Sequence, residues 1–269
     1  MNLRWALRRL AAMDRREVAY RLRQIIHSKL ESVGVGTARV GEPRPAASIP
    51  WSEGLPTGID PAPYLKAAER ILEGRFDVFA LEGQVLGFPP RWNRDPKTGT
   101  EAPHTFGKRL NYRDERLVGD IKYLWEPNRH LELVALAQAW HLSGEERFAL
   151  GCRTLLESWF EQCPYPLGPN WTSSLEHGVR LMNWSFAWRL LGGERSPLFQ
   201  TGEGAGLRRR WLESIYQHAH FIHGHFSRFS SANNHLLGEL AGLYLAGCTW
   251  PCWPGLVKWK AEGRGEVEP

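Results

Sequence analysis

Residues 127–162, PNRHLELVALAQAWHLSGEERFALGCRTLLESWFEQ, contain two helical patterns joined by a short polar link. Apolar side chains recur through the first pattern with the spacing of one helix face: Leu131, Leu133, Val134, Leu136, Ala137 and Trp140. Ser143-Gly-Glu-Glu146 has the form of a capping box, which predicts that the second helix begins there. Helices joined by so short a link pack as antiparallel neighbours, so the stretch predicts a helical hairpin.

The same arrangement recurs toward the C-terminus. Further helices are predicted over residues 173–191, 207–223 and 231–246, the first of them opened by a second capping box, Ser173-Ser-Leu-Glu176. The predicted fold class is therefore mainly α, an array of antiparallel helical hairpins.

The N-terminal third is expected to be mixed. Residues 63–73 form a helical pattern, and residues 76–87 alternate as a strand or hairpin does. Residues 34–62 are rich in Pro and Gly and predict an extended linker or wrapping segment. We therefore divide the chain into an N-terminal helix over 1–33, the linker over 34–62, and a helical domain over 63–269.

The N-terminal helix is basic and amphipathic. The first 26 residues hold seven arginines against two acidic residues, with apolar side chains at near-helical spacing. Such a helix binds a membrane surface or a partner, or it docks on its own domain. No apolar stretch of secretory-signal length is visible, so the sequence predicts no signal peptide and leaves the location open.

The composition is that of a globular protein with an anionic partner. The chain is 42% hydrophobic and 23% charged, which excludes disorder as its main state, and no apolar run approaches the roughly 20 residues of a membrane span. A net charge of +5 favours an anionic partner, but its concentration near the N-terminus argues against nucleic acid. Thirteen tryptophans are explained by core packing or by platforms for sugar rings.

Three polar residues open the helix predicted over 231–246. Asn233, Asn234 and His235 follow the serines of SSANNH and fall in its first turn. One interpretation is capping, because Ser and Asn side chains bind the free N–H groups of a helix start. The other is an anion site, because those N–H groups and the helix dipole favour a bound negative charge.

A second candidate lies in residues 170–184, NWTSSLEHGVRLMNW. Glu176 and Arg180 are four residues apart on one helix face, which suits either a surface ion pair or an arginine held ready for a substrate carboxylate. In the second case Trp171 and Trp184 would supply stacking surface.

Two further groups are weaker. Residues 122–130, KYLWEPNRH, either line a cleft or form an ordinary turn at Pro127. Four histidines between His218 and His225 invite a metal interpretation, but no carboxylate lies among them, so we predict neither a metal site nor a cofactor. The four cysteines are too few for a disulfide framework and are expected to be free.

The motifs WEPNRH, NWTSSLEHGVRLMNW and SSANNHLLGELAGLYLAG, in this order, resemble the N-terminal domain of heparinase II/III-type and related alginate lyases, over roughly Phe76 to Trp259. The resemblance implies an incomplete (α/α) toroid followed by a β-sandwich domain. It also implies cleavage of an acidic, uronate-containing polysaccharide by β-elimination.

The resemblance also implies roles for residues. Asn234 would neutralise the uronate carboxylate, and His235 would assist it or remove the proton. Arg180, oriented by Glu176, would bind a substrate carboxylate, with Asn233 nearby. The tyrosine that protonates the leaving oxygen in this family would fall beyond Pro269, so a truncated lyase is expected. The alternative is a non-catalytic protein that binds acidic glycans or serves exopolysaccharide synthesis.

Overall fold

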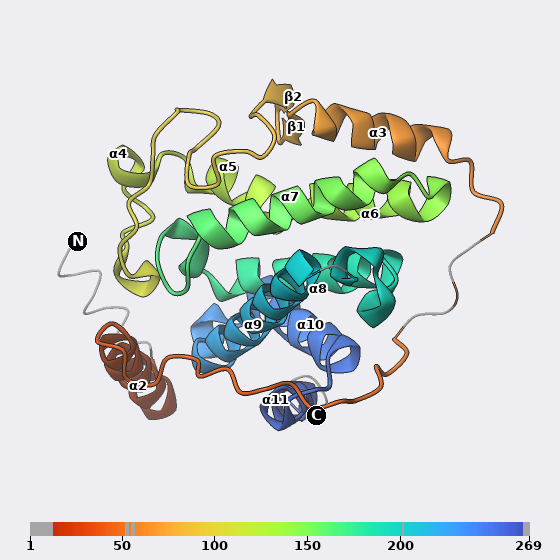
Figure 1. The fold of residues 1–269 in the computed structure, drawn as a ribbon. Coiled ribbons are helices and arrows are strands. Elements are labelled where there is room, and N and C mark those ends of the chain that lie inside the picture. The colour runs from red at the N-terminus through yellow and green to blue at the C-terminus, as the bar shows by residue number, and fades with distance from the viewer. Residues whose placement is uncertain (1–12, 52–53, 55–56, 201, 266–269) are drawn as a thin grey trace.

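The computed structural model describes residues 13–51, 54, 57–200 and 202–265, and it is mainly helical, as predicted (Figure 1). The α-helices are α2 (Arg15–Glu31), α3 (Ala62–Leu72), α4 (Glu115–Val118), α5 (Ile121–Trp125), α6 (Leu131–Ser143), α7 (Glu146–Gln162), α8 (Ser174–Leu190), α9 (Gly202–Gly224), α10 (Asn234–Thr249) and α11 (Pro254–Gly265). An antiparallel hairpin of β1 (Arg75–Val78) and β2 (Leu81–Val85) confirms the hairpin predicted there. None of the described helices is long and apolar enough to cross a membrane.

The helices form stacked layers (Figure 1). Helix α6 packs against α3, α7 and α8, and α8 in turn packs against α9 and α10. The backbones of α8 and α10 touch, because a Cβ atom built on Gly178 would lie 2.5 Å from the carbonyl oxygen of Gly238. The absence of a side chain at Gly178 therefore allows the backbones of α8 and α10 to lie this close. The incomplete (α/α) toroid stays a prediction from the resemblance.

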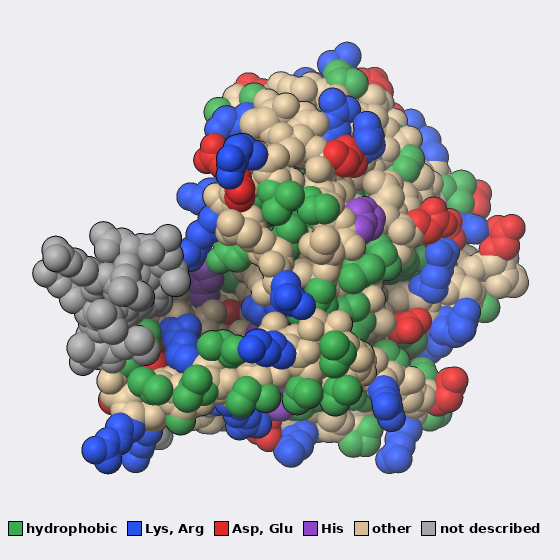
Figure 2. All heavy atoms as spheres, turned by 90° about the vertical axis from the view of Figure 1, so that its left-hand side faces the viewer, with side chains coloured by type: hydrophobic (Ala, Val, Ile, Leu, Met, Phe, Trp, Pro, Cys, Tyr) green, Lys and Arg blue, Asp and Glu red, His purple; other side chains and the backbone are tan. Residues whose placement is uncertain are grey.

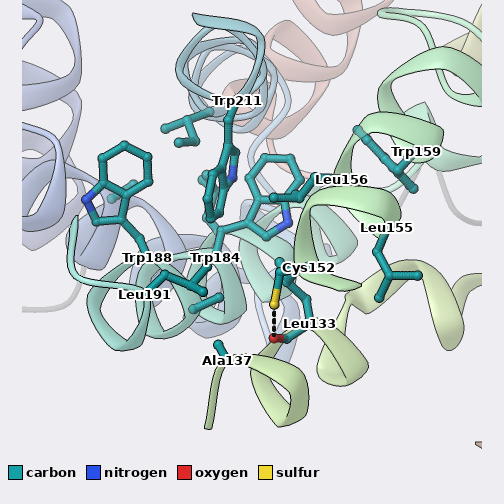
Figure 3. Packing of buried hydrophobic residues seen from close by; sticks show 14 of the residues in the cluster. Leu133, Ala137, Cys152, Leu155, Leu156, Trp159, Trp184, Trp188, Leu191 and Trp211 are labelled. Atoms are coloured by element: carbon teal, nitrogen blue, oxygen red, sulfur yellow. Dashed lines mark hydrogen bonds between the residues drawn. The ribbon is translucent and has the colours of Figure 1, made fainter. Parts of the chain in front are cut away.

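The core is rich in tryptophan. Trp159 of α7, Trp184 and Trp188 of α8, and Trp211 of α9 converge above Leu133 of α6 (Figure 3). The Trp159 and Trp184 ring centroids are 5.7 Å apart and their planes are nearly perpendicular, which is a favourable aromatic geometry. Core packing therefore accounts for most of the tryptophan excess.

The segment before α3 wraps around the domain. In Figure 1 it leaves α2 and runs beside α11. Backbone N–H groups of Arg44 and Ile49 donate to the carbonyl oxygens of Cys252 and Cys248, both at 2.8 Å. These bonds hold the extended chain along the link between α10 and α11. All four cysteines are free, as expected.

Several helix ends differ from the predictions. Ser143 closes α6 instead of capping α7, because Gly144 adopts a left-handed conformation with φ 71° and ends the helix there. The helix over 231–246 begins later, with Asn233 as its cap. The helix α11 was not predicted from the sequence.

The helical pattern was also predicted to include residues 127–130, but these residues are not part of the α-helix. Pro127–Arg129 form a 3-10 turn, and His130 takes a left-handed conformation with φ 62° before α6 begins. This turn carries side chains into the core next to the cleft described below.

Candidate functional site

A cleft of about 520 Å³ opens where the N-terminal ends of α8 and α10 lie close to α2 and to the 3-10 turn Gly107–Arg109. Figure 2 shows this face of the molecule, with a hollow flanked by Lys, Arg and His side chains beside the residues drawn in grey. Its lining side chains come from segments far apart in the sequence: Arg21, Gln24, Lys108, Tyr112, Arg113, Trp125, Thr172, Ser173, Ser174, His225, Phe226, Ser227, Ser230, Ser231, Asn233 and His235.

The cleft is cationic. Arg21, Lys108 and Arg113 line it together with two imidazoles, and none of its lining residues within the described chain is acidic. Lys108 Nζ lies 3.3 Å from the Thr172 carbonyl oxygen, and burial lowers the pKa of its ammonium group to about 8, opposed by the charge of Glu239. A partly desolvated ammonium group in such a place attracts an anion more strongly than one in bulk water.

Two helix N-termini point into the same cleft. Ser173 and Ser174 stand at the start of α8, and Asn233 and His235 at the start of α10. The Asn233 Oδ1 atom accepts the backbone N–H of His235 at 2.8 Å, so this side chain caps its helix. The other predicted residue, Asn234, is exposed at the first position of α10, between two residues that line the cleft. Both helix dipoles favour a bound anion here.

One wall of the cleft is aromatic. Tyr112 and Trp125 are half-buried and their ring centroids are 5.5 Å apart. The Trp125 Nε1–H group donates to the Pro169 carbonyl oxygen at 3.1 Å, which fixes the indole. Neither ring was predicted from the sequence to bind a ligand, although residues 122–130 were one candidate for a cleft lining. Aromatic rings in a cleft wall can pack against a sugar face.

Arg180 does not face the cleft, and its predicted role as a carboxylate-binding residue is wrong. The side chain is fully buried, and its three donor nitrogens bond to His218 Nε2 (2.8 Å), the Asn128 carbonyl oxygen (2.8 Å) and the Asn170 carbonyl oxygen (2.9 Å). Burial lowers the pKa of the guanidinium group to about 10. Each of its three nitrogens therefore donates to a group inside the protein.

Glu176 has a different partner from the predicted one. Its carboxylate accepts two hydrogen bonds from Arg129, Nε to Oε2 at 2.8 Å and Nη2 to Oε1 at 3.1 Å. Arg129 also donates to Glu126 at 2.7 Å. Glu176 therefore ties α8 to the turn of WEPNRH instead of orienting Arg180.

The two tryptophans predicted to stack on sugars are core residues. Trp171 is 1% exposed and Trp184 is 0% exposed, which leaves no face for a ligand. The Trp184 Nε1–H group donates to His130 Nδ1 at 2.8 Å. Asn128 accepts from the Trp159 indole at 2.9 Å. Asn128, His130, Arg180 and Trp184, all from the motifs, thus belong to one buried polar network.

Comparison with known proteins identifies the family to which the motifs belong. A family model described as Heparinase II/III N-terminus matches residues 92–268, about two thirds of the chain. Neither the curated proteins nor the solved structures contain a match. The matched range includes most of the cleft lining and the whole of the buried network. The chain therefore belongs to the heparinase II/III N-terminus family.

Proposed function

We propose that the cleft binds an acidic, uronate-containing glycan and that the protein is a polysaccharide lyase, or the N-terminal part of one. The observation that carries the proposal is the lining itself, which combines cationic side chains, two helix N-termini and an aromatic wall without an acidic group among the described residues. Membership of the family supports the substrate class.

The proposed chemistry is β-elimination. The hydrogen on the carbon next to a uronate carboxylate becomes acidic when that carboxylate is neutralised, which we assign to Asn234 and the start of α10. The imidazole of His235 takes this proton, the glycosidic C–O bond breaks, and a C=C bond forms in the sugar. Tyr112 also lines the cleft, and its phenol suits protonation of the leaving oxygen.

The direct test is the ultraviolet absorbance of the unsaturated uronate product. The chain is incubated with alginate, heparan sulfate, hyaluronan and a bacterial exopolysaccharide, with and without the substitution His235→Ala. A rise in absorbance that His235→Ala removes supports elimination. Glycan binding without any rise supports the alternative, a non-catalytic protein that binds acidic glycans.

Lys108 provides a prediction for binding. We expect Lys108→Met to weaken binding of a uronate oligosaccharide about tenfold at low salt, because a partly buried cation in the cleft is lost. The matched control is Arg116→Ala, which removes an equal charge from an exposed site outside the cleft lining. Isothermal titration calorimetry measures both. Equal losses in the two variants would show that only net charge matters.

We also propose that α2 contacts anionic membrane surfaces. Leu22, Ile25, Ile26 and Leu30 are between 44% and 58% exposed, and basic side chains flank them. Figure 2 shows hydrophobic side chains aligned along the lower part of the face on which α2 lies. An exposed apolar row with basic neighbours is typical of a helix that lies in a membrane interface. The rest of the predicted N-terminal helix, residues 1–12, lies outside the described residues.

Vesicle sedimentation tests this contact. Ile26→Asp is expected to reduce binding to phosphatidylglycerol vesicles at least about tenfold, since burying one isoleucine stabilises by about 1.5–3 kcal/mol. Val85→Asp is the control, because Val85 is equally exposed but belongs to β2. Unchanged vesicle binding by Ile26→Asp would refute the membrane contact. If the unchanged chain instead self-associates and Ile26→Asp does not, the exposed apolar row of α2 contacts a second copy of the chain.

A further inference from the structure

A cluster of two histidines and one glutamate joins α2 to the residue that follows α9, and two of its three members are buried. His225 Nε2 lies 2.7 Å from Glu31 Oε2, and His27 Nε2 lies 3.4 Å from Glu31 Oε1. The three ligand-type atoms lie within 4.8 Å of one another. Glu31 and His225 are each 4% exposed, although 194 residues separate them.

No metal site was predicted from the sequence, because no carboxylate lies among the histidines between His218 and His225. The fold supplies that carboxylate from α2. It also adds His27, which is four residues before Glu31 and therefore on the same face of the helix. Two imidazoles and one carboxylate form a ligand set that zinc uses in proteins, with one position left for water or another ligand.

The Glu31 carboxyl group faces two imidazoles, those of His27 and His225. A neutral imidazole and a carboxylate are the forms that bind a metal ion. His27 Nε2 is a buried atom and makes no hydrogen bond within the described structure.

The backbone leaves room for the imidazole of His27. A Cβ atom built on Gly224, the last residue of α9, would lie 2.7 Å from His27 Nε2. Any larger residue there would push this ring away from Glu31 and His225. The absence of a side chain at this position thus permits the three groups to converge.

We propose that His27, Glu31 and His225 bind a divalent transition-metal ion, zinc above all, which ties α2 to the segment after α9. The two carboxylate oxygens of Glu31 face different imidazoles, so one ion between the three groups would replace one hydrogen bond and one ion-pair contact with three coordinate bonds. Softer thiolate ligands are absent from the cluster, and a nitrogen-rich set disfavours calcium and magnesium.

The test uses the tag-free full chain after removal of metals with a chelator. Titration with Co²⁺ is expected to give visible d–d absorption that saturates at one ion per chain and that Zn²⁺ displaces. Zn²⁺ is also expected to raise the melting temperature. Both His27→Ala and Glu31→Gln are expected to weaken Co²⁺ binding at least about 100-fold. Loss of a residue that only hydrogen-bonds to a ligand already lowers metal affinity by about 10–100-fold, and loss of a ligand itself should cost at least as much.

The matched control is His223→Ala. His223 lies on the same helix end and pairs with Glu262 at 3.1 Å, but it is not part of the cluster. It should bind Co²⁺ as the unchanged chain does. Circular dichroism checks folding, and His27→Ala remains informative if Glu31→Gln fails to fold, because the His27 side chain is 30% exposed. Absence of the Co²⁺ absorption, or equal binding by His27→Ala and His223→Ala, would overturn the proposal and leave a hydrogen-bonded cluster.

Discussion

Replacing Arg180 with alanine is expected to lower the free energy of unfolding by about 3–5 kcal/mol. The guanidinium group bonds to His218 and to the carbonyl oxygens of Asn128 and Asn170, and no water reaches it. Its removal leaves three buried acceptors without a donor and opens a cavity beside Trp159, over whose ring the guanidinium carbon lies at 4.9 Å. Urea unfolding followed by circular dichroism measures the loss.

Arg113→Ala is the control for this experiment. Arg113 lines the cleft and is exposed, so its loss is expected to change stability by no more than about 0.5 kcal/mol. If Arg180→Ala is as stable as the unchanged chain but binds glycan more weakly, Arg180 contacts the glycan directly. Such a result would contradict the buried network described above.

Replacing Asn234 with alanine is expected to lower the rate of elimination about 10²–10³-fold, the usual cost of removing one donor that stabilises developing negative charge. The fold should survive, because Asn233 and not Asn234 supplies the helix cap and the Asn234 side chain is exposed. The measurement is the initial rate of ultraviolet absorbance on the glycan that the unchanged chain cleaves.

Asn111→Ala serves as the matched control, since Asn111 is an exposed asparagine outside the cleft lining. Its rate should equal that of the unchanged chain. If Asn234→Ala and Asn111→Ala turn over glycan equally fast, Asn234 does not bind the reacting carboxylate. A selective loss in Asn234→Ala would tie the chemistry to the start of α10.

Local patterns were sufficient to predict the helices. The apolar period of α6 and the hairpin β1–β2 were visible in the sequence, since both depend on residues close together in the chain. The helix ends were less predictable. Ser143 and Ser173 have the sequence of capping boxes, yet neither caps its helix through its side chain.

The site was predictable only where one segment suffices. Asn233, Asn234 and His235 stand together at one helix start, and the structure places two of them in the cleft lining and the third beside them. Arg180 and Glu176 have the spacing of a surface pair, but the fold turns Glu176 toward Arg129, 47 residues away. The helical period of a sequence relates only residues within the same helix, so it cannot predict a partner 47 residues away.

Burial explains the remaining differences. Trp171 and Trp184 fill the core, while Trp125 lies in the cleft. The same residue type serves both purposes, and only the packing of α8 against its neighbours separates them. The cluster of His27, Glu31 and His225 could not be predicted either, because 194 residues separate Glu31 from His225 in the chain.

The most direct test of the central claim is a ¹H–¹⁵N spectrum of the tryptophan indole groups during titration with a uronate oligosaccharide. Signals are assigned by single Trp→Phe substitutions. The Trp125 indole signal is expected to shift to saturation, because it lies in the cleft wall, while the Trp184 signal stays unchanged in the core. A saturable shift at Trp51, outside this cleft, with Trp125 unaffected would contradict the assignment of the glycan site.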